Sequence, residues 1–369
     1  MDSALGEQLS LPLEAPLQVA HLVSSGGFYG LERMLLEHCQ HAPGRHRVLL
    51  LAGPDELVAR FQAAGVALTR CPDLLSLWRA LDDPRMRPSL LNGHGFKGLI
   101  YGWLGALRFG LPLVTTQHGF TPRNRKQRFY TWLSLRLCRA PQVRSVVCVA
   151  NSIARLHSAA GVREAKLQVI PNGLPPPPER DFVRPPQAPA APLIGFVGRL
   201  SAEKGPDLFV ELAIRLCRQH PELHAVLLGD GPQRQALAAR IDAAGLSARI
   251  LLPGYQDDMA AWLHALDVLV ISSRTEGTPM VLLEAMQAGV PVASFAVGGI
   301  PDVISHGDSG LLAPSGATDH LAAAVDSLLQ DAGLRQHLAD SARRAQLARY
   351  HLPAQAGRWL QLYPDAVGG

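Results

Sequence analysis

A short turn between two glutamates carries the clearest chemical signal in the sequence. Glu276 precedes the turn Gly277-Thr278-Pro279, and Glu284 lies about a turn and a half into the helix predicted over residues 280–288. The apolar run at 267–271 is typical of a buried parallel strand. A glycine turn between such a strand and a helix exposes unpaired backbone N–H groups, which suit a phosphate. The turn therefore predicts a phosphate site.

The two glutamates indicate what accompanies the phosphate. Carboxylates would be repelled by a phosphate, so Glu276 and Glu284 are better suited to accept hydrogen bonds from sugar and ribose hydroxyls. Pro279 suits the first helical position and Gly289 the residue just past the helix end. This stretch therefore predicts a nucleotide-sugar site.

A second candidate site follows the predicted strand at 193–198. Arg199 and Lys204 are five residues apart across a turn, close enough to converge on one anion. Together they suit a departing diphosphate, where negative charge develops when a sugar–phosphate bond breaks. The competing interpretation is a solvated turn.

At these residues the chain resembles a known family. The sequence EGTPMVLLEAMQAGVPV, with glutamates eight positions apart, is similar to the signature of the retaining glycosyltransferases of family 4. Further similarities are GRLSAEKG at 198–205, GDGP at 229–232 and GGIPD at 298–302. The resemblance covers nearly all of the C-terminal half, but in the N-terminal half only Gly26-Gly27 and the region of His118. It implies an α/β protein with the GT-B fold, two Rossmann-like domains facing each other across a cleft.

The resemblance implies roles for further residues. Gly27 would lie against the donor's phosphates from the opposite domain, although a flexible turn is the alternative. His118, at the end of a predicted strand and before a glycine, would hydrogen-bond the donor sugar near the reacting carbon. Tyr255 and Gln256 are candidates for the loop that meets the nucleotide base. His94 and Lys97 are weaker candidates for the acceptor, with an ordinary polar loop as the alternative for His94.

Composition restricts the class of protein. The chain has 369 residues, 47% of them hydrophobic, and no run of 18 uncharged apolar residues. The first 16 residues carry acids instead of a basic region, so we expect no signal peptide and a cytoplasmic location. Five cysteines without C-x-x-C spacing predict a reduced protein with no disulfide framework and no metal site.

Charge is divided unequally between the halves. Residues 1–190 hold 22 Lys and Arg against 13 Asp and Glu, whereas residues 191–369 hold 13 against 18. Residues 123–139 carry six basic residues and no acid, with Phe129, Trp132, Leu133 and Leu137 at spacings of three and four. This pattern predicts either a membrane-surface helix or a core-facing helix with a solvated basic end. The candidate membrane residues are Arg123, Arg125, Lys126, Arg128 and Trp132.

A proline-rich segment divides the chain. Residues 174–192 contain eight prolines, which cannot continue a sheet and form a semi-rigid spacer. We expect an acceptor-side domain at 1–173, completed by a C-terminal helix at about 350–369 that crosses back. The nucleotide-sugar-binding domain is expected at 193–349.

The resemblance implies transfer of a sugar from a UDP- or GDP-sugar to a glycan or lipid-linked acceptor, with retention of configuration. Arg199, Lys204 and the N–H groups of Thr278, Met280 and Val281 would hold the leaving diphosphate. No Asp-x-Asp motif lies in a fitting place, so we expect no metal and no cofactor. Bacterial cell-surface polysaccharide or lipopolysaccharide is the family's commonest setting, at the cytoplasmic face of the inner membrane. A nucleotide-sugar 2-epimerase, a non-catalytic nucleotide-binding subunit and, more distantly, a nucleic-acid-binding protein are the alternatives; we expect no nucleic-acid partner.

Overall fold

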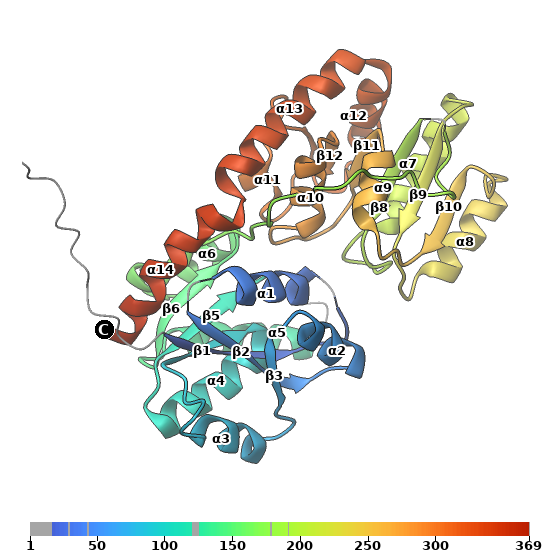
Figure 1. The fold of residues 1–369 in the computed structure, drawn as a ribbon. Coiled ribbons are helices and arrows are strands. Elements are labelled where there is room, and N and C mark those ends of the chain that lie inside the picture. The colour runs from blue at the N-terminus through green and yellow to red at the C-terminus, as the bar shows by residue number, and fades with distance from the viewer. Residues whose placement is uncertain are drawn as a thin grey trace, which may run out of the picture.

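Two parallel sheets, one in each half of the chain, form the framework of the computed structural model (Figure 1). The structure describes residues 17–28, 30–42, 44–119, 125–177, 179–190 and 192–368. The first sheet has the order β3-β2-β1-β4-β5-β6-β7, with every neighbouring pair parallel. Its strands are β1 (Gln18–Ser24), β2 (Arg45–Ala52), β3 (Ala67–Arg70), β4 (Leu90–His94), β5 (Leu113–Gln117), β6 (Val143–Cys148) and β7 (Leu167–Val169).

Helices cover both faces of this sheet, which explains why its central strands are buried at almost every position. The helices are α1 (Gly30–His41), α2 (Asp55–Ala63), α3 (Leu74–Asp82), α4 (Gly95–Phe109), α5 (Arg125–Cys138) and α6 (Asn151–Ala159), followed by the 3-10 turn η1 (Glu164–Lys166). One face packs Leu22, Leu49 and Leu91 against α3 and α4, with all three side chains fully buried.

The second sheet repeats the architecture with the order β10-β9-β8-β11-β12-β13, again all parallel. Its strands are β8 (Leu193–Val197), β9 (His224–Leu228), β10 (Ile250–Gly254), β11 (Val268–Ile271), β12 (Val292–Phe295) and β13 (Leu311–Ala313). Its helices are α7 (Pro206–Gln219), α8 (Arg234–Ala243), α9 (Met259–Ala265), α10 (Met280–Ala288), α11 (Ile300–Val303), α12 (Thr318–Gln330) and α13 (Ala332–Arg349).

The last helix, α14 (Leu352–Gly368), returns to the first sheet (Figure 1). Trp359 and Tyr363 pack there in a buried cluster with Val19 of β1 and Val114 of β5. Leu174, where the proline-rich segment begins, hydrogen-bonds through its backbone to Tyr350 and Leu352. The chain thus crosses between the two halves twice, and the two crossings lie side by side.

The predicted α/β class with two parallel-sheet domains is confirmed. Helix α10 has the predicted bounds, although Pro279 is its N-cap and not its first residue. Among the described helices, none combines the length and the apolar character needed to cross a lipid bilayer.

Candidate active site between the two domains

A cavity of about 990 Å³ lies between the two domains, at the carboxyl ends of strands from both sheets. Ligands of open parallel sheets bind at this edge. The lining includes every predicted donor residue except Gly27. These residues are His118, Arg199, Lys204, Tyr255, Gln256, Glu276, Gly277, Thr278, Met280, Val281 and Glu284.

An ion pair joins the two sequence signatures. Lys204 Nζ donates to Glu276 Oε1 at 2.7 Å and to Oε2 at 2.8 Å, and Ser273 Oγ donates to Oε1 at 2.7 Å. The Glu276 side chain is only 7% exposed and that of Lys204 is 32% exposed. An ammonium has three N–H donors, so Lys204 keeps one for another acceptor in the cavity. Glu276 is therefore fixed in place, whereas Lys204 can serve two anions at once.

The turn before α10 is packed tightly against the first domain. A Cβ at Gly277 would lie 2.5 Å from the carbonyl oxygen of His118, a distance that real Cβ atoms do not reach, so this position requires glycine. The first N–H groups of a helix have no partner within that helix, and Met280 and Val281 of α10 both line the cavity. The N-terminus of α10 thus provides backbone donors beside Lys204 and Glu276.

Thr278 connects the domains through its side chain. Its hydroxyl donates to the carbonyl of Val149, and its own carbonyl accepts from Asn172 Nδ2 at 2.9 Å. A third contact is donated by the backbone N–H of Asn151 to Asp302 Oδ2 at 2.8 Å. The first two bonds hold the turn before α10 against the first domain, and the third holds α11 there.

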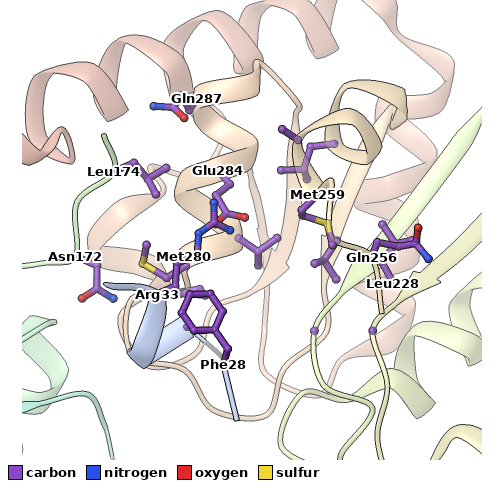
Figure 2. A pocket seen from close by; sticks show the side chains of 18 of the residues that line it. Phe28, Arg33, Asn172, Leu174, Leu228, Gln256, Met259, Met280, Glu284 and Gln287 are labelled. Carbon is purple, nitrogen blue, oxygen red and sulfur yellow. The ribbon is translucent and has the colours of Figure 1, made fainter. Parts of the chain in front are cut away.

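Glu284 makes an ion pair across the cavity that the sequence did not predict. Arg33 of α1 approaches Glu284 Oε1 at 2.7 Å (Figure 2). Burial raises the pKa of Glu284, and Arg33 opposes that shift. The carboxylate expected to meet a ribose is therefore held by an arginine from the opposite domain.

Tyr255 and Gln256 lie at the far wall of the cavity. The side chain of Tyr255 is 56% exposed. Gln256 Oε1 accepts from Trp262 Nε1 at 3.0 Å and its Nε2 donates to the Pro253 carbonyl at 3.3 Å, so this side chain holds its own loop. Gln256 is thus a positioning residue here, and a base at this wall would meet backbone groups or the Tyr255 ring.

His118 is the last member of a row of histidines. His118 Nε2 lies 3.3 Å from His94 Nδ1, His94 Nε2 lies 3.0 Å from His21 Nδ1, and His21 Nε2 lies 2.9 Å from His46 Nδ1. Burial lowers the pKa of His118 to about 4, so its ring is neutral at physiological pH. A neutral imidazole has one donor and one acceptor nitrogen, so the whole row must donate in one direction or the other.

Three predicted positions lie away from the cavity. His94 is buried behind His118 with both ring nitrogens occupied by histidines, which corrects the expectation of an acceptor contact. Lys97 is exposed on α4 and does not line the cavity. Gly27 closes a turn with Ser25, while its neighbours Phe28 and Gly30 line the cavity in its place.

The basic helix α5 exposes its aromatic residues. Phe129 and Trp132 are 55% and 52% exposed, and their rings stack at 5.8 Å. The buried positions of α5 are Ser134 and Cys138, which differ from the predicted apolar stripe. Arg123 lies outside the described residues, and Arg125, Lys126 and Arg128 are exposed on the first turns of α5.

Two parallel-sheet domains with a ligand cavity at their facing carboxyl edges define a GT-B protein. The family described as glycosyl transferases group 1 matches residues 179–345, and that described as glycosyltransferase family 4 matches residues 28–176. The chain belongs to the group 1 glycosyltransferases, and it is therefore an enzyme that transfers a sugar.

Relatives and solved structures agree with this assignment. A 2-deoxystreptamine N-acetyl-D-glucosaminyltransferase of Streptomyces fradiae is 31% identical over 95% of this chain and 87% of that protein. Two shorter matches are each 32% identical over 47% of this chain. The chain covers 46% of the alpha-D-kanosaminyltransferase of Streptomyces kanamyceticus and 49% of the lipopolysaccharide core biosynthesis glycosyltransferase LpsE of Rhizobium meliloti. The structure of Anabaena HepE with UDP-glucose superposes with a TM-score of 0.83 and 20% identity, over 94% of this chain and 99% of that one, which confirms the GT-B fold.

Reasoning from the sequence missed Arg33 and Phe28, which line the cavity from the first domain. It also missed the row of histidines behind His118. Strand order brings the histidines together, and the packing of the two domains places Arg33 and Phe28 at the cavity. No spacing in the sequence therefore indicates either group.

Proposed function

We propose that the enzyme transfers a sugar from a UDP- or GDP-sugar to a glycan or lipid-linked acceptor with retention of anomeric configuration. One observation carries this proposal: Arg199, Lys204 and the N-terminal residues of α10 all line the same cavity. Two cations and backbone donors in one cavity suit a diphosphate, since they oppose the charge that develops on it as the sugar leaves.

The arrangement around Glu276 favours a mechanism without a carboxylate nucleophile. Glu276 accepts two hydrogen bonds from Lys204 and one from Ser273, which removes much of its nucleophilic character. In the proposed reaction the acceptor hydroxyl attacks the sugar carbon on the face that the diphosphate leaves. The bond from that carbon to the phosphate oxygen breaks, and the acceptor's proton passes to the departing phosphate. Glu276 would instead bind the donor sugar's hydroxyls, and His118 would bind the sugar from the opposite domain.

The other donor contacts follow from the same placement of the sugar and the diphosphate in the cavity. Glu284 would meet the ribose, and the wall formed by Tyr255 and Gln256 would meet the base. None of these steps uses a metal, so we propose metal-independent transfer. Biosynthesis of bacterial surface polysaccharide or lipopolysaccharide is the proposed setting, supported by the relative from Rhizobium meliloti.

Titration calorimetry with UDP, GDP and ADP in the presence of a chelator tests the donor site. We expect one nucleotide to bind, with binding lost in Lys204→Ala, and we expect Lys204→Ala or Glu276→Ala to abolish transfer without unfolding the protein. Full transfer activity in either variant would contradict these roles, and failure of all three nucleotides to bind would favour a non-catalytic subunit that binds only a partner. Donor consumption without any acceptor, yielding an epimerised sugar, would indicate the 2-epimerase.

The exposed surface of α5 supports peripheral attachment to an anionic membrane. The exposed rings of Phe129 and Trp132 are apolar groups that can insert into the lipid headgroup region. The exposed cations Arg125 and Arg128 precede them on the same helix and would face anionic lipids. The enzyme would then meet a lipid-linked acceptor at the cytoplasmic face of the inner membrane.

Vesicle flotation tests this attachment. We expect the protein to float with vesicles containing anionic phosphatidylglycerol but not with phosphatidylcholine alone, and the double variant Phe129→Ser/Trp132→Ser to stay in the dense fraction. Leu75→Ser removes a side chain of similar exposure (54%) from α3 and serves as the control. Equal flotation of the double variant and the wild type would exclude α5 as the contact.

A further inference from the structure

A group of potential metal ligands lies in the first domain, outside the cavity. His21 of β1, Cys39 of α1 and His46 of β2 each offer one ligand atom, and these atoms all lie within 4.8 Å of one another. His21 is fully buried, whereas Cys39 and His46 are partly exposed. An ion could therefore reach the group from solvent while one ligand is held rigidly by the sheet.

The donor set indicates the kind of ion. Two imidazole nitrogens and one thiolate sulfur suit a borderline divalent ion, whereas magnesium and calcium prefer oxygen ligands. We propose that His21, Cys39 and His46 bind one Zn²⁺ ion, with water in the fourth position. This site is separate from the donor cavity and does not depend on which nucleotide sugar binds there.

Small movements of the side chains would bring the three ligand atoms to the distances that a tetrahedral zinc ion requires. His21 Nε2 and His46 Nδ1 are 2.9 Å apart and share a hydrogen bond, whereas two nitrogens on a tetrahedral zinc are about 3.3 Å apart, given Zn–N bonds of about 2.0–2.1 Å. A sulfur and a nitrogen on the same ion are about 3.5 Å apart. Rotation about the side-chain bonds of Cys39 and His46 provides these changes, because neither residue is fully buried.

The buried ligand His21 can donate a hydrogen bond from its second ring nitrogen, as metal-binding histidines usually do. His21 Nδ1 lies 3.0 Å from His94 Nε2, so it can donate to His94 and leave the lone pair of His21 Nε2 facing Cys39 and His46. His38 packs edge-on against both ligand rings, at 5.3 Å from His21 and 5.1 Å from His46. Its Nε2 lies 2.9 Å from the hydroxyl oxygen of Tyr363, so α14 supports this wall.

Zinc at this position would act on the row of histidines. With a lone pair of His21 Nε2 on the metal, His21 Nδ1 must carry the proton and donate to His94, which then donates to His118 Nε2. His118 would consequently carry its own proton on Nδ1. The metal thus selects one of the two directions open to the row and fixes the tautomer of His118.

Cobalt substitution tests the site, because Co²⁺ reports both its ligands and its geometry by absorption. We expect one equivalent of Co²⁺ to give the intense visible bands of a tetrahedral ion and a thiolate-to-metal charge-transfer band, both removed by Zn²⁺. Cys39→Ser should lose the charge-transfer band, and His46→Gln should weaken binding at least tenfold. The controls are Cys217→Ser in α7 and His41→Gln, an exposed histidine at the end of α1. Absence of the bands, or their survival in Cys39→Ser, would overturn the proposal.

Two measurements on the wild-type protein keep the test decisive if a ligand variant does not fold. Burial raises the pKa of the Cys39 thiol to about 12, which slows its alkylation, but Cys39 is the only partly exposed cysteine among the described residues, so the reagent should reach it before the four buried ones. We expect Zn²⁺ to slow alkylation of Cys39 at least tenfold, and a concentration of 100 times Kd to raise Tm by about 5 °C. Nitrogen-15 spectra should show His118 protonated on Nδ1 when zinc is bound. An alkylation rate and a Tm that zinc does not change would refute the site.

Discussion

Lys204 and Glu276 form an ion pair in the cavity, and we expect their replacement to change nucleotide affinity in opposite directions. Both residues line the cavity, and Lys204 contacts both oxygens of a carboxylate that is almost fully buried. If a diphosphate oxygen takes the third N–H of Lys204, it lies at hydrogen-bond distance from Nζ, and therefore about 4.5 Å from the carboxylate oxygens. Lys204 then attracts the nucleotide while Glu276 repels it.

Coulomb's law gives the size of each effect. At about 4.5 Å and an effective dielectric constant of about 20, the repulsion between Glu276 and one phosphate charge is about 4 kcal/mol as an upper value. The attraction by Lys204 at about 2.8 Å is about 6 kcal/mol on the same basis. Desolvation reduces both, so we expect Glu276→Gln to tighten UDP binding about tenfold and Lys204→Met to weaken it at least a hundredfold.

Transfer activity should separate from binding in these variants. Glu276→Gln retains an oxygen that accepts hydrogen bonds but loses the charge that holds a sugar hydroxyl, so kcat should fall although UDP binds more tightly. Calorimetry with UDP and GDP measures affinity, steady-state assays measure kcat, and thermal unfolding shows whether each variant is folded. If Glu276→Gln weakens nucleotide binding as Lys204→Met does, then Glu276 acts by positioning Lys204 and the electrostatic argument is wrong.

Three further predictions follow from the packing of the cavity. Gly277→Ala places a Cβ 2.5 Å from the carbonyl oxygen of His118 and should separate the domains, so the transfer rate should fall at least tenfold. Gly357→Ala is the control: its Cβ meets nothing within 4 Å, so the transfer rate should not change in the same assay. Because the pKa of His118 is lowered from 6.5 to about 4 by burial, the unfolded chain takes up a proton first as the pH falls, so stability is lost between these two values. We expect His118 to account for up to about 2 kcal/mol of that loss between about pH 7 and about pH 5, and denaturant unfolding should show a smaller loss in His118→Gln. Arg33→Met should destabilise the protein by about 2 kcal/mol in urea unfolding, because Arg33 is 44% exposed but leaves behind the Glu284 carboxylate, which is only 11% exposed; no measurable loss would contradict this argument.

Much of the fold could be predicted from periodicity and turn residues. The apolar run at 267–271 corresponds to β11, and the pattern ending at Gly289 corresponds to α10; this glycine lies just past the helix end as predicted, and its backbone is left-handed. These features are local, so the sequence contains the whole signal. The apolar stripe of residues 123–139 left two interpretations open, because a stripe alone does not tell whether it faces a core or the solvent; in the structure α5 buries Ser134 and Cys138 and exposes Phe129 and Trp132.

The site could be predicted where a short segment of the chain carries the signal, as at His118 in the first domain and at four residues of the second. Arg199, Lys204, Glu276 and Glu284 lie in recognisable segments of the second domain, and the structure brings all four to one cavity. The row of histidines depends instead on the strand order β2-β1-β4-β5, in which β1 and β4, which are distant in the chain, become neighbours. His21 lies 73 residues before His94, and no periodic pattern links such positions. His21, Cys39 and His46 lie on the consecutive elements β1, α1 and β2, but their spacings of 18 and 7 residues match no metal-binding motif.

The two glutamates of the signature are held in different ways, and this difference bears on how the domains cooperate. Glu276 is paired with Lys204 inside the second domain, so its position does not depend on the first domain. Glu284 is paired with Arg33 across the cavity, so a ribose hydroxyl that takes this carboxylate must share it with, or displace, a contact between domains. The hydrogen bonds from the Thr278 hydroxyl to Val149 and from the Asn151 N–H to Asp302 do not involve Glu284, so they would persist through such an exchange. Nucleotide binding would therefore compete with the contact made by α1, while the turn before α10 stays attached to the first domain.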